Sequence, residues 1–214
     1  MKKNLILFSV LFACIIMSVV DAVIMPGYII KSIIKIVLFL VIPFLFSKDC
    51  FKYLKAGKKG IGLALFLGII IYFVILGAYY IFKDIFDFSA LTESLGETTG
   101  VNKSNFIWVS IYISFVNSFL EEFFFRGFAF LTLKNLSSRR FAYIFSSTVF
   151  ALYHIAMMIG WFGVPVLLIV VAGLFAGGLI FNKLDEIYDN IYISWHVHMF
   201  ANFAINTIGF ILFK

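Results

Sequence analysis

The most constraining feature of the sequence is a succession of seven long apolar stretches separated by short charged loops. A helix needs about 20 apolar residues to cross the hydrocarbon core of a bilayer, and each stretch is about that long. With 63% hydrophobic residues among 214, the chain has more apolar surface than a soluble domain of this length can bury. We therefore predict an all-α, polytopic transmembrane helix bundle of about seven helices, at residues 5–23, 29–46, 61–82, 106–133, 141–159, 164–181 and 191–213. The region 84–104 leaves room for an eighth, short helix.

Basic residues cluster at the N-terminus, in the loop 47–60 and in the loop 134–140. If the chain crosses the membrane seven times, these three regions lie on the same side. The positive-inside rule then predicts a multi-pass protein of the cell membrane with a cytoplasmic N-terminus. These loops account for the net charge of +6. Because the lysines form no basic face interleaved with aromatic residues, we expect the lipid bilayer, and no nucleic acid, as a partner.

Three charged residues lie inside the fourth apolar stretch, where an ionisable group is costly unless it is paired or faces a polar cavity. Glu122 and Arg126 are four residues apart with the acid first, the favourable order for an ion pair on one helix face. We expect this pair to be a structural salt bridge. Glu121 points about 100° away around the helix and has no such local partner, so we expect it to have a function.

Two rows of polar side chains accompany these charges. The row in the fourth stretch ends at Glu121, and its members are three or four residues apart: Ser110, Ser114, Asn117 and Glu121. The row in the seventh stretch repeats every four residues: Ser194, His198, Asn202 and Asn206. Such spacings place each row on one helix face, which we expect to point into the bundle. His196 points to the other side of the seventh stretch and is expected at the membrane interface. In the sixth stretch, Gly173, Gly177 and Gly178 form a small-residue face that predicts close helix packing.

Outside the fourth stretch, only the fifth and seventh are expected to carry ionisable groups at depth. His154 lies in the middle of the fifth stretch, and His198 lies in the seventh. At about 1.5 Å per residue, Glu121, His154 and His198 lie about 18, 21 and 12 Å from the cytoplasmic ends of their helices. The sequence therefore predicts that one carboxylate, two imidazoles and the amide of Asn202 meet inside the bundle.

Such a cluster has a natural chemistry. A carboxylate removed from bulk water can take a proton from an attacking water molecule and later give it to a leaving amine. One imidazole can hold or polarise that water, and a second imidazole with an amide can donate hydrogen bonds to the oxyanion that forms. The sequence contains no G-x-S-x-G motif for a serine nucleophile. Hydrolysis of a peptide bond by an activated water is the reaction that this set favours.

Three short motifs resemble the signatures of the CAAX protease and bacteriocin-processing (CPBP, or Abi) family of intramembrane endopeptidases. They are "EEFFFR" at 121–126, "FALYH" at 150–154 and "HMFAN" at 198–202. Each motif alone is weak, but their order, spacing and placement on successive membrane stretches are specific together. The resemblance covers about residues 105–210. It implies a division of the chain into N-terminal transmembrane helices and loops, 1–104, and a core of catalytic helices, 105–214.

The resemblance also implies a role for each matching residue. Glu121 and His154 would activate the attacking water, and His198 and Asn202 would stabilise the oxyanion. Glu122 and Arg126 match positions that support the site. Both a metal-dependent and a metal-free mechanism have been considered for this family. Zinc is the metal to consider, but H-E-x-x-H is absent. We favour the metal-free mechanism without a cofactor; a metal, if one binds, would be held by Glu121, His154 and His198.

The function implied by the resemblance is cleavage of a membrane-associated peptide, lipopeptide or protein. The cut would fall near the C-terminus of the substrate, or would belong to peptide maturation or bacteriocin immunity. An alternative is a non-catalytic immunity protein or membrane signalling partner that keeps the same fold. A third hypothesis is a proton-coupled carrier, because carriers also contain intramembrane Glu and His, although we find no inverted repeat.

Overall fold

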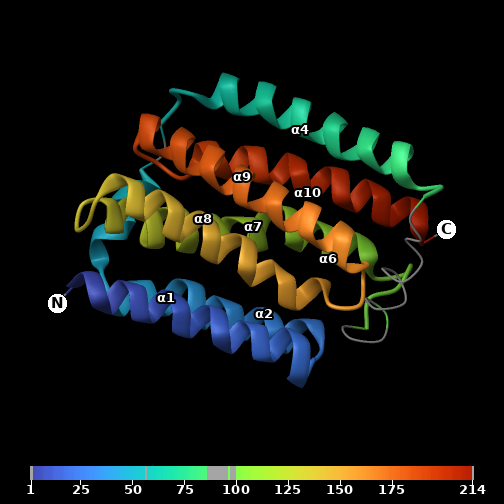
Figure 1. The fold of residues 1–214 in the computed structure, drawn as a ribbon, viewed down its shortest axis with the longest axis horizontal. Helices are drawn as coiled ribbons and strands as arrows, with labels where there is room; N and C mark the ends of the chain where they lie inside the picture. The colour runs from blue at the N-terminus through green and yellow to red at the C-terminus, as the bar shows by residue number, and fades with distance from the viewer. Residues whose placement is uncertain (1, 56, 86–95, 97–99, 214) are drawn as a thin grey trace.

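The computed structural model describes residues 2–55, 57–85, 96 and 100–213, and these residues form an all-α bundle (Figure 1). Several of its long helices switch between α-helical, π-helical and 3-10 turns without a break in the chain direction. The described elements are α1 (Lys2–Val19), η1 (Val20–Ile24), α2 (Tyr28–Ile36), η2 (Val37–Val41), α3 (Ile42–Phe46), η3 (Lys48–Leu54), α4 (Ile61–Phe82), α6 (Phe106–Tyr112), η4 (Ile113–Asn117), α7 (Ser118–Glu122), η5 (Phe123–Thr132), α8 (Arg139–Ile155), η6 (Ala156–Met158), α9 (Val164–Tyr188) and α10 (Tyr192–Leu212).

The predicted polytopic bundle is confirmed. Among the described residues, six helices are long and apolar enough to cross a membrane: Lys2–Ile24, Tyr28–Phe46, Ile61–Phe82, Phe106–Thr132, Arg139–Met158 and Val164–Tyr188. The seventh predicted stretch is the 21-residue helix α10. Its histidines and asparagines reduce its hydropathy, although its length suffices to span the bilayer. The eighth helix predicted within 84–104 falls largely on residues outside the described part of the chain.

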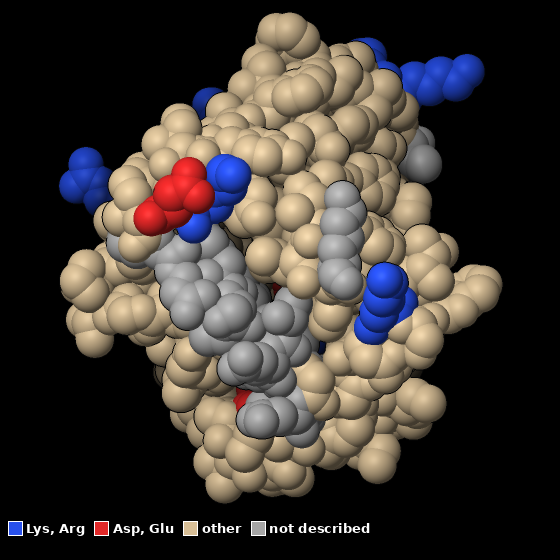
Figure 2. Space-filling model, turned by 90° about the vertical axis from the view of Figure 1, so that its right-hand side faces the viewer, with Lys and Arg blue, Asp and Glu red and all other residues tan. Residues whose placement is uncertain are grey.

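Basic loops gather at one end of the bundle, as the sequence predicted. In Figure 1 the N-terminus, η3 and the loop between η5 and α8 lie at the same end, and the C-terminus lies at the other. One contact joins two of these segments: Lys2 Nζ lies 3.7 Å from Asp49 of η3. Near the third segment, Arg139 Nη2 at the start of α8 lies 2.7 Å from Glu186 of α9. Figure 2 faces the opposite end, where only scattered charged side chains are visible among the described residues. This asymmetry of charge is typical of a multi-pass membrane protein.

One long helix, from α6 through η5, runs through the middle of the bundle. The segments α1 and η2 lie on one side of it, while α8, α9 and α10 lie on the other, and α4 packs on the outer face of α10 (Figure 1). All ten residues of η5 are buried, including five phenylalanines. The ring of Phe124 stacks on that of Phe39 from η2 with a centroid distance of 4.1 Å. A helix that is apolar on every side must be surrounded by other parts of the protein, and neighbouring helices surround η5 in this way.

The central helix is π-helical over η4 and η5, on both sides of the two glutamates. The side chain of Thr132 stabilises the wider turn by donating a 2.8 Å hydrogen bond to the carbonyl of Gly127, five residues earlier. π-helical turns are rare and occur mostly at functional sites. They also change the angle between successive side chains, so the directions predicted from a regular α-helix hold only locally.

The predicted small-residue face of α9 is only partly correct. A Cβ atom added to Gly178 would lie 3.1 Å from Ser147 of α8, so the absence of a side chain there permits close packing. Nothing lies within 4 Å of the equivalent positions at Gly173 and Gly177. These two glycines therefore do not pack against another described helix.

Candidate active site

The carboxylate of Glu121 meets both predicted histidines inside the bundle. Glu121 lies in α7, His154 near the end of α8 and His198 in the first half of α10. Glu121 Oε2 lies 3.7 Å from His154 Nε2 and 3.8 Å from His198 Nε2. The glutamate is buried, and the two imidazoles are nearly so. The predicted convergence of the three helices at these residues is confirmed.

The other nitrogen of each imidazole has a partner that fixes its tautomer. His154 Nδ1 lies 2.7 Å from the carbonyl oxygen of Phe150, and His198 Nδ1 lies 2.8 Å from Glu122 Oε1. Since both partners are acceptors, each Nδ1 carries the hydrogen, and each Nε2 of a neutral ring is an acceptor. Three acceptors thus face one another at distances too long for direct hydrogen bonds. A water molecule, which donates two hydrogen bonds, has the chemistry that such a group requires.

Glu121 is not unpaired, contrary to our expectation from the sequence. Lys35 Nζ donates a 2.9 Å hydrogen bond to Glu121 Oε1 and a 2.6 Å hydrogen bond to Asn117 Oδ1. Asn117 Nδ2 donates to the same Glu121 Oε1 at 2.9 Å. Lys35 comes from α2, 86 residues away in the chain, and is 3% exposed. Its only signal in the sequence is a charge that interrupts the apolar stretch 29–46.

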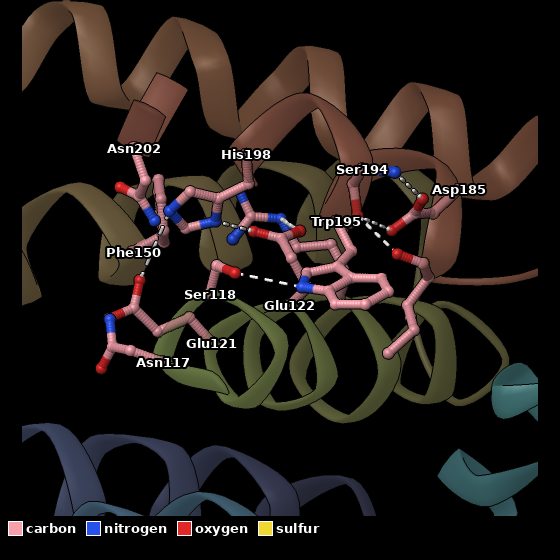
Figure 3. A network of polar contacts seen from close by, with 12 residues as sticks. Asn117, Ser118, Glu121, Glu122, Phe150, Asp185, Ser194, Trp195, His198 and Asn202 are labelled. Carbon is pink, nitrogen blue, oxygen red and sulfur yellow. Dashed lines mark hydrogen bonds and ion pairs between the residues drawn. The ribbon is translucent and has the colours of Figure 1, made fainter. Parts of the chain in front are cut away.

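The expectation of ionisable groups in only three helices is also wrong. Besides Lys35, the first two helices contain an ion pair in which Lys31 Nζ, on a partly exposed side chain, lies 2.5 Å from Oδ1 of the buried Asp21 side chain. The helix α9 extends beyond the predicted end at residue 181 and contains Asp185, which is fully buried. Asp185 accepts hydrogen bonds from the backbone and side chain of Ser194 at 3.0 and 2.6 Å, and thereby ties α9 to the start of α10 (Figure 3).

The predicted salt bridge between Glu122 and Arg126 is present. Arg126 Nε lies 3.2 Å from Glu122 Oε2, and both side chains are fully buried. The guanidinium also lies over the ring of Phe150 at 4.0 Å and near that of Phe181 at 5.1 Å. These contacts supply cation–π attraction in a place without solvent. Glu122 also binds His198. The ion pair therefore neutralises a buried charge and also fixes the orientation of one imidazole of the cluster.

The two polar rows point into the bundle, as their spacing predicted, and there they face each other. Asn206 Nδ2 donates to the carbonyl oxygen of Ser110 at 3.1 Å and to Ser114 Oγ at 2.9 Å. Asn202 Nδ2 donates to the carbonyl oxygen of Ile113 at 3.2 Å. The side-chain amide of Asn202 has two N–H groups, so this bond leaves the second one for another acceptor. The rows thus join α10 to the segment from α6 to η4.

His196 lies outside the cluster. Its Nδ1 lies 2.5 Å from the carbonyl oxygen of Tyr192 on the same helix, and its ring contacts Trp195. Trp195 in turn donates a 3.0 Å hydrogen bond to Ser118 Oγ of α7 (Figure 3). The predicted assignment of His198, and not His196, to the cluster is therefore correct in its geometry.

A groove of about 260 Å³ lies along part of the two polar rows. Its polar side is formed by Ser110, Ser114 and Asn206, and its apolar side includes Phe203 and Phe210. Asn202 lies one helical turn before Asn206 on the same face of α10. An extended, amphipathic chain has the chemistry that fits a groove with one polar and one apolar wall.

The residues of the cluster do not fit a metal site. Across the described ranges, no group of three or more His, Cys, Asp and Glu side chains has the geometry to hold a metal ion. The ammonium of Lys35 already binds Glu121 and would be repelled by a divalent cation placed beside that carboxylate. No step considered below passes through a metal.

A buried carboxylate that faces two imidazoles, within a bundle of membrane-crossing helices, defines a multi-pass membrane protein with a hydrolase-like site. Residues 103–204 match the model of the family described as type II CAAX prenyl endopeptidase, Rce1-like. This match includes all three motifs at 121–126, 150–154 and 198–202, and the expected resemblance to the CAAX proteases is confirmed over this segment. Over these residues the chain is similar to this family. No curated protein and no solved structure matches the chain.

Proposed function

We propose that this protein is an intramembrane endopeptidase that hydrolyses a peptide bond of a membrane-associated peptide, lipopeptide or protein. The observation that carries the proposal is the position of Glu121 Oε2 between two imidazole nitrogens, at 3.7 and 3.8 Å, inside a membrane bundle. A carboxylate and an imidazole acceptor that share one space can hold and deprotonate a water molecule. The family match over residues 103–204 supports the same activity.

The reaction would begin with water held between Glu121 Oε2 and His154 Nε2. The water oxygen attacks the carbonyl carbon of the scissile peptide bond, and its proton passes to Glu121. The tetrahedral intermediate carries an oxyanion. Glu121 then gives the proton to the nitrogen of the leaving amine as the C–N bond breaks. The products are a new carboxyl terminus and a new amino terminus, and Glu121 returns to its starting state.

His198 and Asn202 would stabilise the oxyanion. The second N–H of the Asn202 amide is one donor. His198 donates from Nε2 only when the ring carries both protons, because Glu122 binds Nδ1. Carboxylates lie near both ring nitrogens and are partners for this charged form. Glu122 and Arg126 support the site through His198.

The groove beside the polar rows and the family match support the proposed class of substrate. The groove along α10 has a polar and an apolar wall and suits an extended amphipathic segment. The family name refers to prenylated CAAX proteins, so cleavage near the C-terminus of a lipidated chain is one form of this activity. Peptide maturation and bacteriocin immunity are the other roles that we proposed from the motifs. We place the protein in the cell membrane with the N-terminus in the cytoplasm.

The proposal is tested with purified protein in lipid nanodiscs. It is incubated with a panel of synthetic peptides that contains farnesylated C-terminal CAAX peptides, acylated peptides and unmodified hydrophobic peptides. The products are identified by mass spectrometry. We expect cleavage of at least one class by the wild type and none by Glu121→Gln, which keeps the shape of the side chain but cannot accept the proton. Equal cleavage by a folded Glu121→Gln variant would refute the mechanism. A folded wild type that cleaves no peptide while still supporting immunity or signalling would favour the non-catalytic alternative.

A further inference from the structure

The two oxygens of the Glu121 carboxylate have different surroundings. Oε1 accepts two hydrogen bonds, from Lys35 Nζ and from Asn117 Nδ2, each at 2.9 Å. Lys35 also donates to Asn117 Oδ1 at 2.6 Å, so the three side chains form a closed ring of hydrogen bonds. Oε2 faces His154 and His198, beyond direct hydrogen-bond distance from both. One oxygen is thus held by the protein, and the other faces the space for the reaction.

We infer that Lys35 is a positioning residue: it holds Oε1 of Glu121 so that Oε2 stays directed between the two imidazoles. This inference rests on the proposed function, because it assigns Oε2 as the oxygen that takes the proton. Lys35 lies in α2, outside the three motifs and outside residues 103–204 that match the family model. The helix α2 therefore contributes to the site as well as to the bundle.

The surroundings of Lys35 suit this role. Its ammonium is 3% exposed and lies 5.2 Å from the ring centroid of Tyr153 and 5.7 Å from that of Phe39. An ammonium enclosed in this way is costly unless strong acceptors surround it. Both of its hydrogen-bond acceptors belong to the face of the central helix that carries Glu121. A salt bridge needed only for neutralisation does not require the additional amide that fixes the same carboxylate oxygen.

The chain offers a matched control one helical turn away. Lys31 lies on the same helix α2 and also pairs with a buried acid, with its Nζ 2.5 Å from Asp21 Oδ1. The structure shows no contact of Lys31 with Glu121 among the described residues. Loss of either lysine leaves a buried carboxylate without its cation, and this should reduce stability in both variants. Only the loss of Lys35 should free the Glu121 carboxylate from its fixed orientation.

The experiment compares Lys35→Met and Lys31→Met in nanodiscs, using the peptide of the panel that the wild type cleaves fastest. We expect Lys35→Met to lower kcat roughly 100-fold with KM unchanged, since a displaced catalytic group loses orientation and the groove stays intact. Lys31→Met should lose a similar amount of thermal stability and keep the wild-type kcat. If Lys35→Met does not fold, Lys35→Gln, which keeps N–H donors without the charge, undergoes the same kinetic comparison.

A thermal-unfolding cycle tests the contact separately from catalysis. Lys35→Met combined with Glu121→Gln should be more stable than Lys35→Met alone, because the double variant leaves no unpaired charge. A wild-type kcat in folded Lys35→Met, or an equal loss of kcat in Lys31→Met, would overturn the positioning role. If the proposed function is wrong, the outcome is different: Glu121→Gln would still cleave the peptide, whatever the effect of substituting Lys35.

Discussion

Glu122 and His198, which are 76 residues apart in the chain, are joined by a 2.8 Å contact between Oε1 and Nδ1. The same carboxylate binds Arg126 through its other oxygen at 3.2 Å. One glutamate thus links an ion pair within the central helix to an imidazole on α10. This relationship changes what the second glutamate of the E-E-x-x-x-R motif is expected to do.

Glu122→Gln should reduce both stability and activity. The substitution leaves the fully buried Arg126 without a carboxylate, which typically costs about 3–5 kcal/mol. It also replaces the anionic acceptor at His198 Nδ1 with an amide, so the ring loses its orientation. Thermal unfolding in nanodiscs and kcat for the best peptide measure the two effects. A variant that is less stable but has the wild-type kcat would show that the contact with His198 is irrelevant to catalysis.

The three histidines should differ sharply on substitution. His154→Ala and His198→Ala should each lower turnover by at least about 100-fold, the scale for the loss of an acid–base helper or an oxyanion donor. His196→Ala should keep wild-type turnover, because the contacts of its ring with Tyr192 and Trp195 lie within its own helix and outside the cluster. Initial rates for the same peptide provide the comparison. A strong defect in His196→Ala together with an active His198→Ala would mean that the residues of α10 have been assigned to the wrong faces.

Removal of metal ions should leave the activity unchanged. The described part of the chain contains no group of side chains with the geometry of a metal site, and Lys35 binds the carboxylate that would be the ligand. Protein treated with 1,10-phenanthroline and then desalted should cleave the peptide at the untreated rate. Metal content is measured by mass spectrometry before and after treatment. Loss of activity that stoichiometric zinc restores would contradict the metal-free mechanism.

Two neighbouring glycines of α9 should respond differently to a larger side chain. Gly178→Leu should destabilise the protein by roughly 1–3 kcal/mol, because even its Cβ would lie 3.1 Å from Ser147 of α8. Gly177→Leu is the matched control, since nothing lies within 4 Å of that position. Thermal unfolding of both variants in nanodiscs measures the difference. Equal unfolding temperatures would indicate that α8 and α9 do not pack closely at this point.

The sequence by itself determined the elements of this protein. Apolar stretches of about 20 residues predicted the helices, because every backbone polar group in a bilayer must be bonded within its own helix. Local spacing predicted the ion pair of Glu122 with Arg126 and the two polar rows, since residues three or four apart share a helix face. The similar depths of Glu121, His154 and His198 along their helices predicted that these residues meet.

Only the tertiary structure decided which partners surround each charge. The pairing of Lys35 with Glu121 and that of Glu122 with His198 join helices distant in the chain, and no local periodicity encodes such contacts. The π-helical turns beside the glutamates also alter side-chain directions that a regular α-helix would give. A lysine in an apolar stretch has an unfavourable free energy in lipid and a favourable one beside a carboxylate. Which of these applies to Lys35 depends on the packing of α2 against the central helix.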